Sequence, residues 1–146
     1  MDKRPLVSIV TVVYNGEKHL EESIKSVINQ TYDNVEYIII DGGSTDGTVD
    51  IIKKYEDKID YWVSEKDGGI YDAMNKGIVI SHGKIIGIVN ADDLIYPDTL
   101  AKVSQAFKND EVMFTYGQVD LADENSKIFD IAKSIGLQSL KYRLFR

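Results

Sequence analysis

The sequence has no cysteine, which excludes disulfides, thiolate catalysis and cysteine-ligated zinc and agrees with a reducing, cytoplasmic location. It also lacks any apolar run near the roughly 20 residues that a transmembrane helix needs. We expect no secretory signal, because the first residues lead into only a short apolar stretch that Ser8 and Thr11 interrupt. Neither of the two histidines, His19 and His82, has a partner spaced for zinc or a catalytic triad.

Basic residues are in the minority, at 17 against 24 acidic ones, and the net charge of -7 argues against a general nucleic-acid binder. The segment 133–146 nevertheless carries four basic residues and no acid, so the rest of the chain has a charge of about -11. This basic segment could contact phosphates or the inner face of a membrane, or it could be a helix separated from its neighbours. An acidic body that binds a phosphate ester needs a metal ion between the like charges.

Short apolar runs rich in β-branched residues predict four strands, at Val7–Val13, Val35–Ile40, Asp60–Ser64 and Lys84–Val89. The first strand is followed by Leu20, Ile24, Val27 and Ile28, which share one face of a helix. Similar helical spacing recurs at Val49–Tyr55, Ile70–Ile78 and Leu100–Phe107, and Pro97 is expected in the first turn of the last helix. A fifth strand at Val112–Tyr116 and a hairpin of Gln118–Ala122 with Lys127–Ile131 are expected to follow.

Four strand–helix repeats predict an α/β fold with a mostly parallel central sheet and helices on both faces. A polar segment directly follows each of the four strands: Tyr14-Asn15-Gly16, residues 41–47, residues 65–69 and Asn90-Ala91-Asp92-Asp93. These segments therefore lie at the carboxyl edge of one sheet, which is where open α/β sheets bind ligands. We expect them to form one composite site.

The adjacent acids Asp92 and Asp93 are the most informative part of this edge. They follow the apolar run 85–89, which reads as a buried strand, and two carboxylates at the mouth of such a strand repel each other and lose hydration. A divalent cation would compensate, and Mg²⁺ or Mn²⁺ fits one or two protein carboxylates with phosphates and water as the other ligands. The alternative is an ordinary turn before a helix, where Asp is common.

Asp41 closes the second strand and opens a loop that contains Gly42, Gly43 and Gly47. Its carboxylate could accept a hydrogen bond from a base or a ribose hydroxyl, or the loop could be only a tight turn with a helix cap. The glycine spacing is not that of a dinucleotide-binding loop, and no P-loop lysine motif occurs. In the stretch Gly68–Gly77, which joins a flexible loop to a helix, Tyr71 and Lys76 could serve a ligand, although Lys76 could also be merely solvated. We expect Gly77 to allow close helix–sheet packing.

These segments resemble family 2 of the glycosyltransferases, inverting nucleotide-sugar enzymes with the GT-A fold. The resemblance rests on six motifs in order along residues 6–120: Val7–Asn15, Ser26–Tyr32, Ile40–Thr48, Asp67–Gly77, Asn90–Asp93 and Tyr96–Asp98. The stretch from Gly69 to Gly77 is similar to bacterial enzymes that build surface polysaccharides. The resemblance implies a nucleotide-diphosphate sugar as donor and a glycan or a lipid-linked molecule as acceptor.

The resemblance also implies roles by position. Thr11, Tyr14 and Asp41 match positions that hold the nucleotide base and ribose. Asn90-Ala91-Asp92 matches the D-x-D motif with Asn in its first place, which implies nucleotide contact for Asn90 and Asp92. Asp92 is the implied first ligand of Mg²⁺ or Mn²⁺, and Asp93 the second.

The family's general base lies in its acceptor-binding half, beyond Arg146, and Asp120, Asp123 and Glu124 occur too early to match it. We therefore expect residues 1–132 to form the donor-binding domain, residues 133–146 to begin an acceptor-side segment, and the 146 residues alone to transfer little sugar. A module that binds a nucleotide sugar without turnover would have the same sequence features. A glycoside hydrolase is disfavoured, because adjacent carboxylates cannot flank a sugar from opposite sides.

Overall fold

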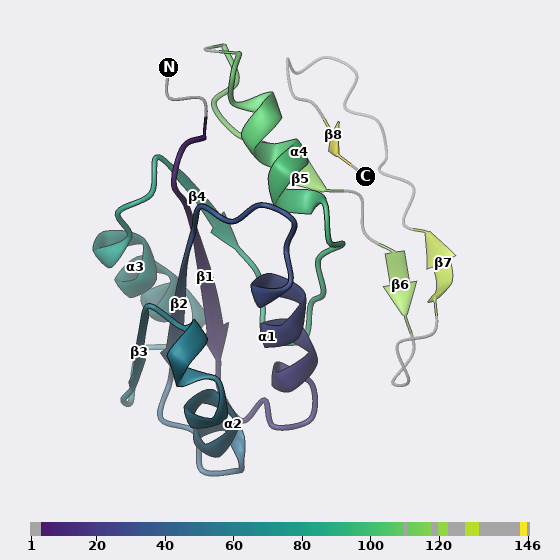
Figure 1. Ribbon diagram of the computed structural model, residues 1–146. Coiled ribbons are helices and arrows are strands. Elements are labelled where there is room, and N and C mark those ends of the chain that lie inside the picture. The colour runs from purple at the N-terminus through teal and green to yellow at the C-terminus, as the bar shows by residue number, and fades with distance from the viewer. Residues whose placement is uncertain (1–3, 110, 118–119, 123–127, 132–143, 146) are drawn as a thin grey trace.

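The computed structural model describes residues 4–109, 111–117, 120–122, 128–131 and 144–145. Its centre is a sheet of four parallel strands in the order β3-β2-β1-β4 (Figure 1). The strands are β1 (Val7–Val13), β2 (Val35–Asp41), β3 (Tyr61–Ser64) and β4 (Ile85–Ile88). All four lie within one or two residues of their predicted limits, and the predicted α/β class with a parallel sheet is confirmed.

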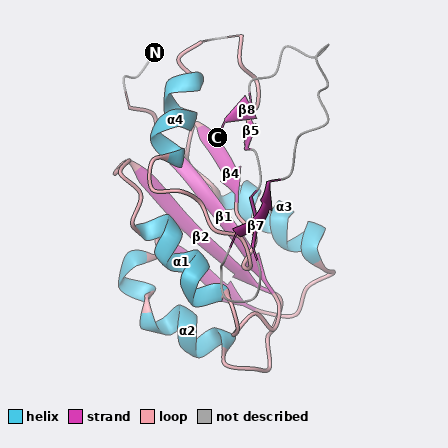
Figure 2. Ribbon diagram, turned by 90° about the vertical axis from the view of Figure 1, so that its right-hand side faces the viewer, coloured by secondary structure: helices cyan, strands magenta, loops and turns pink. Residues whose placement is uncertain are grey.

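The helices cover both faces of the sheet, as predicted. On one face α1 (Leu20–Ile28), α2 (Thr48–Lys54) and α4 (Thr99–Ala106) pack against alternate residues of β1 and β2, with the short 3₁₀ helix η1 (Glu56–Lys58) after α2. On the other face α3 (Ile70–Ile80) is the covering helix. Figure 2 shows α3 on the opposite side of the sheet from α1 and α2. Val10, Val12, Ile38 and Ile40 form the buried layer beneath α3.

Helix α3 lies close to the sheet because Gly77 faces β1. A Cβ atom at Gly77 would lie 2.3 Å from Cγ1 of Val10, far inside van der Waals contact. Val10 is fully buried and β-branched, so its side chain has little freedom to move aside. The predicted role of Gly77 in close helix–sheet packing is thus confirmed.

Three sequence-based expectations differ from the structure. The fourth strand was expected to be buried, but Ile86 and Ile88 are 42% and 43% exposed, because β4 lies at the edge of the described sheet and α3 does not cover it. Residues 112–115 are not in a strand. The strand expected there is reduced to β5 (Tyr116–Gly117), which pairs in parallel with β8 (Leu144–Phe145). Helix α4 begins at Thr99, so Pro97 precedes the helix and is not in its first turn.

The predicted hairpin is present as β6 (Asp120–Ala122) paired antiparallel with β7 (Ile128–Ile131). Its connection, residues 123–127, and most of the basic segment 133–146 lie outside the described residues. The predicted boundary at residue 132 therefore stays a prediction. None of the helices in the described part of the chain is long and apolar enough to cross a bilayer.

An ion-pair cluster ties α1 to α2 and makes stability depend on pH. Glu21 Oε1 accepts hydrogen bonds from Lys54 Nζ at 2.8 Å and from the Tyr55 hydroxyl at 2.6 Å, and Lys25 Nζ lies 3.1 Å away. The bond from Lys54, followed by those from Tyr55 and Lys25, lowers the pKa of Glu21 from 4.5 to about 2. A carboxylate with a lowered pKa in the folded state stabilises the fold above its unfolded pKa, and this contribution is lost as the pH falls through the folded value.

We therefore expect Glu21→Gln to lower the urea midpoint at pH 7, and to lower it much less near pH 2, where Glu21 in the original protein is itself becoming protonated. The measurement is urea unfolding followed by circular dichroism at several pH values. Glu56→Gln is the matched control, because the exposed Glu56 side chain makes no hydrogen bond or ion pair with the other described residues. An equal loss of midpoint at both pH values would contradict the expectation.

Candidate functional site

Four loops leave the carboxyl ends of the four parallel strands and meet at one edge of the sheet. We call them the first loop (residues 14–19, after β1), the second loop (42–47, after β2), the third loop (65–69, after β3) and the fourth loop (89–98, after β4). Their order in space follows the strand order, so the first loop lies between the fourth and the second. The predicted convergence of four polar segments at one sheet edge is confirmed.

The first and second loops are joined by hydrogen bonds in both directions. Asn15, which has a φ of 51°, donates from its main-chain nitrogen to Ser44 Oγ at 2.7 Å, and its Oδ1 accepts from the Thr45 nitrogen at 2.8 Å. The main-chain nitrogen of Gly16 donates to Thr48 Oγ1 at 2.8 Å. Asn tolerates the left-handed conformation, in which both the main chain and the side chain of Asn15 can form hydrogen bonds with the second loop. The two loops therefore form a single unit.

Acidic residues reinforce the same contact. Glu17 Oε2 accepts from the main-chain nitrogen of Gly47 at 2.7 Å, and Asp46 Oδ2 accepts from that of Glu17 at 3.1 Å. Desolvation opposes the charge of Asp46, but hydrogen bonds from Thr48 and from the main chain outweigh it and lower the pKa of Asp46. The carboxylate of Asp46 consequently stays ionised well below neutral pH.

Asp41 ends β2 and is completely buried beneath the second loop. Its Oδ2 accepts from the Ser44 main-chain nitrogen at 3.0 Å and from Ser64 Oγ at 2.5 Å, and its Oδ1 accepts from Ser44 Oγ. A buried carboxylate needs such donors to offset its lost hydration. Because each carboxylate oxygen can accept about two hydrogen bonds, Oδ1 has a lone pair beyond the one that Ser44 uses, although the buried side chain is closed off from solvent in this conformation.

The third loop packs against the second with almost no space for side chains. A Cβ atom at Gly42 would lie 3.0 Å from Asp67 Oδ2, and one at Gly43, whose φ is +83°, would lie 3.1 Å from the Lys66 nitrogen. The main-chain nitrogen of Glu65 also donates to the Asp41 carbonyl at 3.0 Å. Glycine in the second loop is thus required for the approach of the third, which places the Asp67 carboxylate against Gly42, the residue after Asp41.

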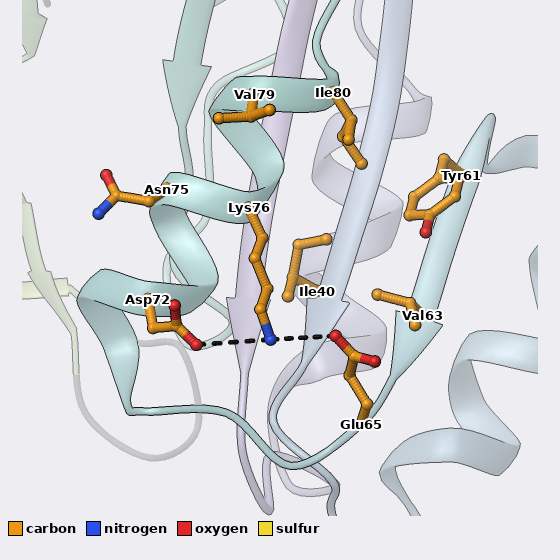
Figure 3. A pocket seen from close by; sticks show the side chains of 9 residues that line it. All are labelled: Ile40, Tyr61, Val63, Glu65, Asp72, Asn75, Lys76, Val79 and Ile80. Atoms are coloured by element: carbon orange, nitrogen blue, oxygen red, sulfur yellow. Dashed lines mark hydrogen bonds and ion pairs between the residues drawn. The ribbon is translucent and has the colours of Figure 1, made fainter.

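Lys76 links the third loop to α3. Its Nζ lies 3.0 Å from Glu65 Oε1 and 3.4 Å from Asp72 Oδ2, and the Asp72 carboxylate accepts from the main-chain nitrogen of Gly68 at 3.0 Å. The bond to Glu65 is the main cause of a raised pKa of Lys76. Figure 3 shows these three charged side chains at one end of a pocket of about 390 Å³ between α3 and β3, whose walls include Ile40, Tyr61 and Val63. In this conformation the Lys76 ammonium group is paired with the carboxylates of Glu65 and Asp72.

The fourth loop presents the tetrad Asn90–Asp93. The Asn90 carbonyl accepts from the Asp93 nitrogen at 3.0 Å, which closes a turn, and Asn90 Nδ2 donates to Asp93 Oδ2 at 3.0 Å. Asn90 Oδ1 is buried and has no hydrogen-bond partner among the described residues. Asp92 is exposed and likewise pairs with no other described residue. The turn therefore holds two acceptor groups without a partner among the described residues, one a buried amide oxygen and the other an exposed carboxylate.

The first loop lies beside this turn, since a Cβ atom at Gly16 would be 3.6 Å from Cβ of Ala91. Tyr14 precedes Gly16 and is 65% exposed, so its ring is accessible at the edge. Thr11 lies deeper: it is completely buried, with its Oγ1 3.2 Å from the Tyr37 hydroxyl. Burial raises the pKa of the Tyr37 phenol, which keeps that hydrogen bond neutral. Thr11 thus forms part of the floor beneath the loops.

Sequence reasoning missed Ser44 and Ser64, which hold the Asp41 carboxylate, and the link through Asn15 between the first two loops. Serine in a loop is too common to signal such a contact. The pairing of Asp41 with Ser64 could have been anticipated only from the register of β2 and β3. The described residues contain no group of three His, Asp or Glu side chains arranged around a common metal position.

A family model described as "Glycosyl transferase family 2" matches residues 8–145. A glycosyltransferase of Rickettsia bellii is 39% identical over 84% of this chain and 18% of its own length. One of Mycobacterium tuberculosis is 40% identical over 73% of this chain and 41% of its own length. A third, of Haemophilus influenzae, is 33% identical over 93% of this chain and 57% of its own length.

Solved structures agree with these relatives. TarS of S. aureus, in complex with UDP-GlcNAc, superposes with a TM-score of 0.65 at 26% identity, over 70% of this chain and 31% of that chain. The mannosyltransferase PcManGT from Pyrobaculum calidifontis, in complex with GDP-Man and Mn²⁺, gives 0.68 at 26% identity, over 81% and 36%. The fold and the motifs at its carboxyl edge define a GT-A domain. The chain belongs to glycosyltransferase family 2, and it spans less than two thirds of the length of these relatives.

Proposed function

We propose that the protein transfers a sugar from a nucleotide-diphosphate sugar to a hydroxyl of a glycan or lipid-linked acceptor, with inversion and with the help of Mg²⁺ or Mn²⁺. The observation that carries the proposal is the tetrad turn. It holds the amide oxygen of Asn90 and the carboxylate of Asp92, neither of which has a partner among the described residues, next to the first loop, which carries the exposed Tyr14. The UDP-GlcNAc complex of TarS and the GDP-Man complex of PcManGT support a donor of this class.

Each predicted site residue has a proposed task. Tyr14 stacks on the nucleotide base, since an exposed aromatic face suits a base. Asp41 accepts a hydrogen bond from the base or the ribose through its remaining lone pair on Oδ1, which requires the second loop above the buried carboxylate to move, while Ser44 and Ser64 hold the carboxylate. Thr11 supports these residues from the floor of the site. Asn90 contacts the ribose.

The residues of the fourth loop fit a hard divalent cation. Mg²⁺ and Mn²⁺ prefer oxygen ligands and keep several positions for phosphate and water, so one or two protein carboxylates are enough. Asp92 would be the first ligand, because its carboxylate has no competing partner among the described residues, and Asp93 the second. Mn²⁺ in the PcManGT complex supports this choice of metal. The acidic edge also needs a cation if it is to accept a diphosphate.

The chemistry that the cation would supply is Lewis-acid stabilisation of the charge that develops on the departing diphosphate. The chain's own residues then orient the donor: Tyr14 and Asp41 hold the nucleoside, and the fourth loop keeps the diphosphate end at the carboxyl edge. Transfer with inversion also needs a general base on the acceptor hydroxyl. We keep the expectation that this base belongs to an acceptor-binding part beyond Arg146, so that the 146 residues alone transfer little sugar.

Isothermal titration calorimetry with UDP, GDP, CDP and dTDP, each with Mn²⁺ and with EDTA, tests the proposal. We expect one nucleotide to bind at least tenfold more tightly with Mn²⁺, because the cation removes the repulsion between the diphosphate and the acidic edge. Equal affinities with and without metal would contradict the metal-assisted part. Tight, metal-dependent binding without any transfer by the protein in its complete form would favour a binding module.

A further inference from the structure

Helix α1 and the turn after it carry a row of polar side chains on the side that faces the fourth loop, with Ser23 and Ser26 in the helix and Gln30 two residues beyond its end. Ser23, Ser26 and Gln30 lie at spacings of three and four residues, which places them one above the other on a helix. Ser23 is completely buried, and the other two are partly buried. Polar groups that leave water in this way must find partners in the protein. We call these three residues the α1 polar row.

Every partner outside α1 is a main-chain atom of the segment 90–100. Ser23 Oγ donates to the Asn90 carbonyl at 3.2 Å, and Ser26 Oγ accepts from the Ile95 nitrogen at 3.2 Å. Gln30 makes two such bonds, from Nε2 to the Tyr96 carbonyl at 2.7 Å and from the Leu100 nitrogen to Oε1 at 3.0 Å. The row therefore holds the fourth loop at three places and the first turn of α4 at a fourth.

The row is itself oriented by bonds within α1. Ser26 Oγ donates its proton to the Ser23 carbonyl at 2.8 Å, so the hydroxyl presents a lone pair to Ile95. Gln30 Nε2 also donates to the Ser26 carbonyl at 2.9 Å, which determines which end of the amide faces which partner. A reversed amide would place its oxygen against two carbonyls. The Ser26 hydroxyl and the Gln30 amide are thus oriented by bonds that do not involve the fourth loop.

Two of these bonds act near the start of the fourth loop and just beyond its end. The Asn90 carbonyl, bound by Ser23, is also the acceptor that closes the turn to Asp93. Leu100 lies in the first turn of α4, whose cap residue Asp98 makes no side-chain cap hydrogen bond. Gln30, in the segment after α1, therefore satisfies a main-chain N–H in the first turn of α4 and fixes the start of the element that follows the loop.

We propose that Ser23, Ser26 and Gln30 are positioning residues for the donor site, which hold the fourth loop so that Asn90, Asp92 and Asp93 face the diphosphate. The proposal rests on the proposed function for the identity of that ligand. The apolar anchors of the loop, Ala91 and Ile95, pack against the core, but apolar contact is non-directional. Hydrogen bonds to main-chain atoms have strict geometry. They therefore determine the orientation of the fourth loop, which the apolar contacts alone do not determine.

The first test needs no ligand. Amide hydrogen exchange, followed residue by residue by NMR, should be faster at Ile95 in Ser26→Ala and at Leu100 in Gln30→Ala, by roughly tenfold for one lost hydrogen bond. Ser26→Thr keeps the hydroxyl and should restore slow exchange at Ile95. Asn29→Ala is the matched control, because the exposed Asn29 side chain on the same helix end makes no hydrogen bond with other described residues. Unchanged exchange at both amides would overturn the proposal.

The second test measures metal. Binding of Mn²⁺ is followed by electron paramagnetic resonance in the presence of the nucleoside diphosphate that binds the original protein. We expect Ser26→Ala and Gln30→Ala to weaken Mn²⁺ binding about tenfold, with the nucleotide affinity in EDTA unchanged and with rescue by Ser26→Thr. Equal losses of metal and metal-free nucleotide affinity would mean general damage and would overturn the proposal. If the original protein showed no metal-dependent nucleotide binding, the proposed function would be contradicted. The hydrogen-exchange experiment would then show by itself whether Ser26 and Gln30 hold the fourth loop.

Discussion

Replacement of Asp92 by alanine is expected to remove most of the gain in nucleotide affinity that Mn²⁺ provides, a loss of roughly 100-fold or more in metal affinity. Asp92 is the carboxylate of the tetrad with no competing partner among the described residues, whereas Asp93 already accepts from Asn90. The Asp93→Ala variant should therefore lose less. Calorimetry with Mn²⁺ and with EDTA separates the metal-dependent part of the affinity from the rest.

Asp50→Ala is the matched control for this prediction. It removes one exposed carboxylate from α2 and changes the net charge by the same amount, but Asp50 is not part of any of the four loops. It should leave both affinities unchanged. If Asp92→Ala reduced nucleotide binding in EDTA as strongly as in Mn²⁺, Asp92 would act on the nucleotide itself or on the fold, and its assignment as a metal ligand would be wrong.

The second large effect is expected on stability. Gly77→Ala places a Cβ atom 2.3 Å from Cγ1 of the fully buried Val10, so α3 or β1 must move. Such overpacking costs about 1 to 3 kcal/mol, which exceeds the gain of up to ~1 kcal/mol from better helix propensity. We expect a clear loss of urea midpoint, and a larger one for Gly77→Val.

Two variants make this test specific. In Gly68→Ala the new Cβ would lie 3.5 Å from its nearest neighbour in Asp72, an ordinary contact, so the change should cost little. Val10→Ala frees space under α3 and should be less damaging in the Gly77→Ala background than alone, which is a positive coupling in a double-mutant cycle. Additive losses would show that the contact between Gly77 and Val10 is not the cause.

The core of the fold could be predicted from sequence because β-branched runs and helical spacing alternate without interruption from Val7 to Ala106. Neither signal reports how many neighbours a strand has. The run 85–89 looks the same whether it is covered on both faces or, as β4 is, left with Ile86 and Ile88 partly exposed at an edge. Residues 112–115 show a second kind of error. Their apolar run predicts a strand, but the segment is irregular, and no strand among the described residues pairs with it.

The location of the site could be predicted from the sequence, but the hydrogen bonds that hold its loops could not. Parallel strands put Asp41 and the tetrad at one edge by topology alone. The α1 polar row could have been suspected from Ser23, because Leu20, Ser23, Ile24 and Val27 share one buried face and a serine on such a face needs a partner. The partners themselves are main-chain atoms of residues distant in sequence, and no side-chain pattern encodes them.

The interlocked first and second loops have a consequence for engineering donor preference. Asn15, Gly16 and Glu17 exchange hydrogen bonds with Ser44 through Thr48, so neither loop has a conformation independent of the other. A graft that replaces only residues 42–47 with those of a relative would leave Asn15 and Glu17 facing unmatched partners. Residues 14–48 should therefore be exchanged as one unit in such a graft, because the hydrogen bonds between the two loops are kept only when both sides are replaced together.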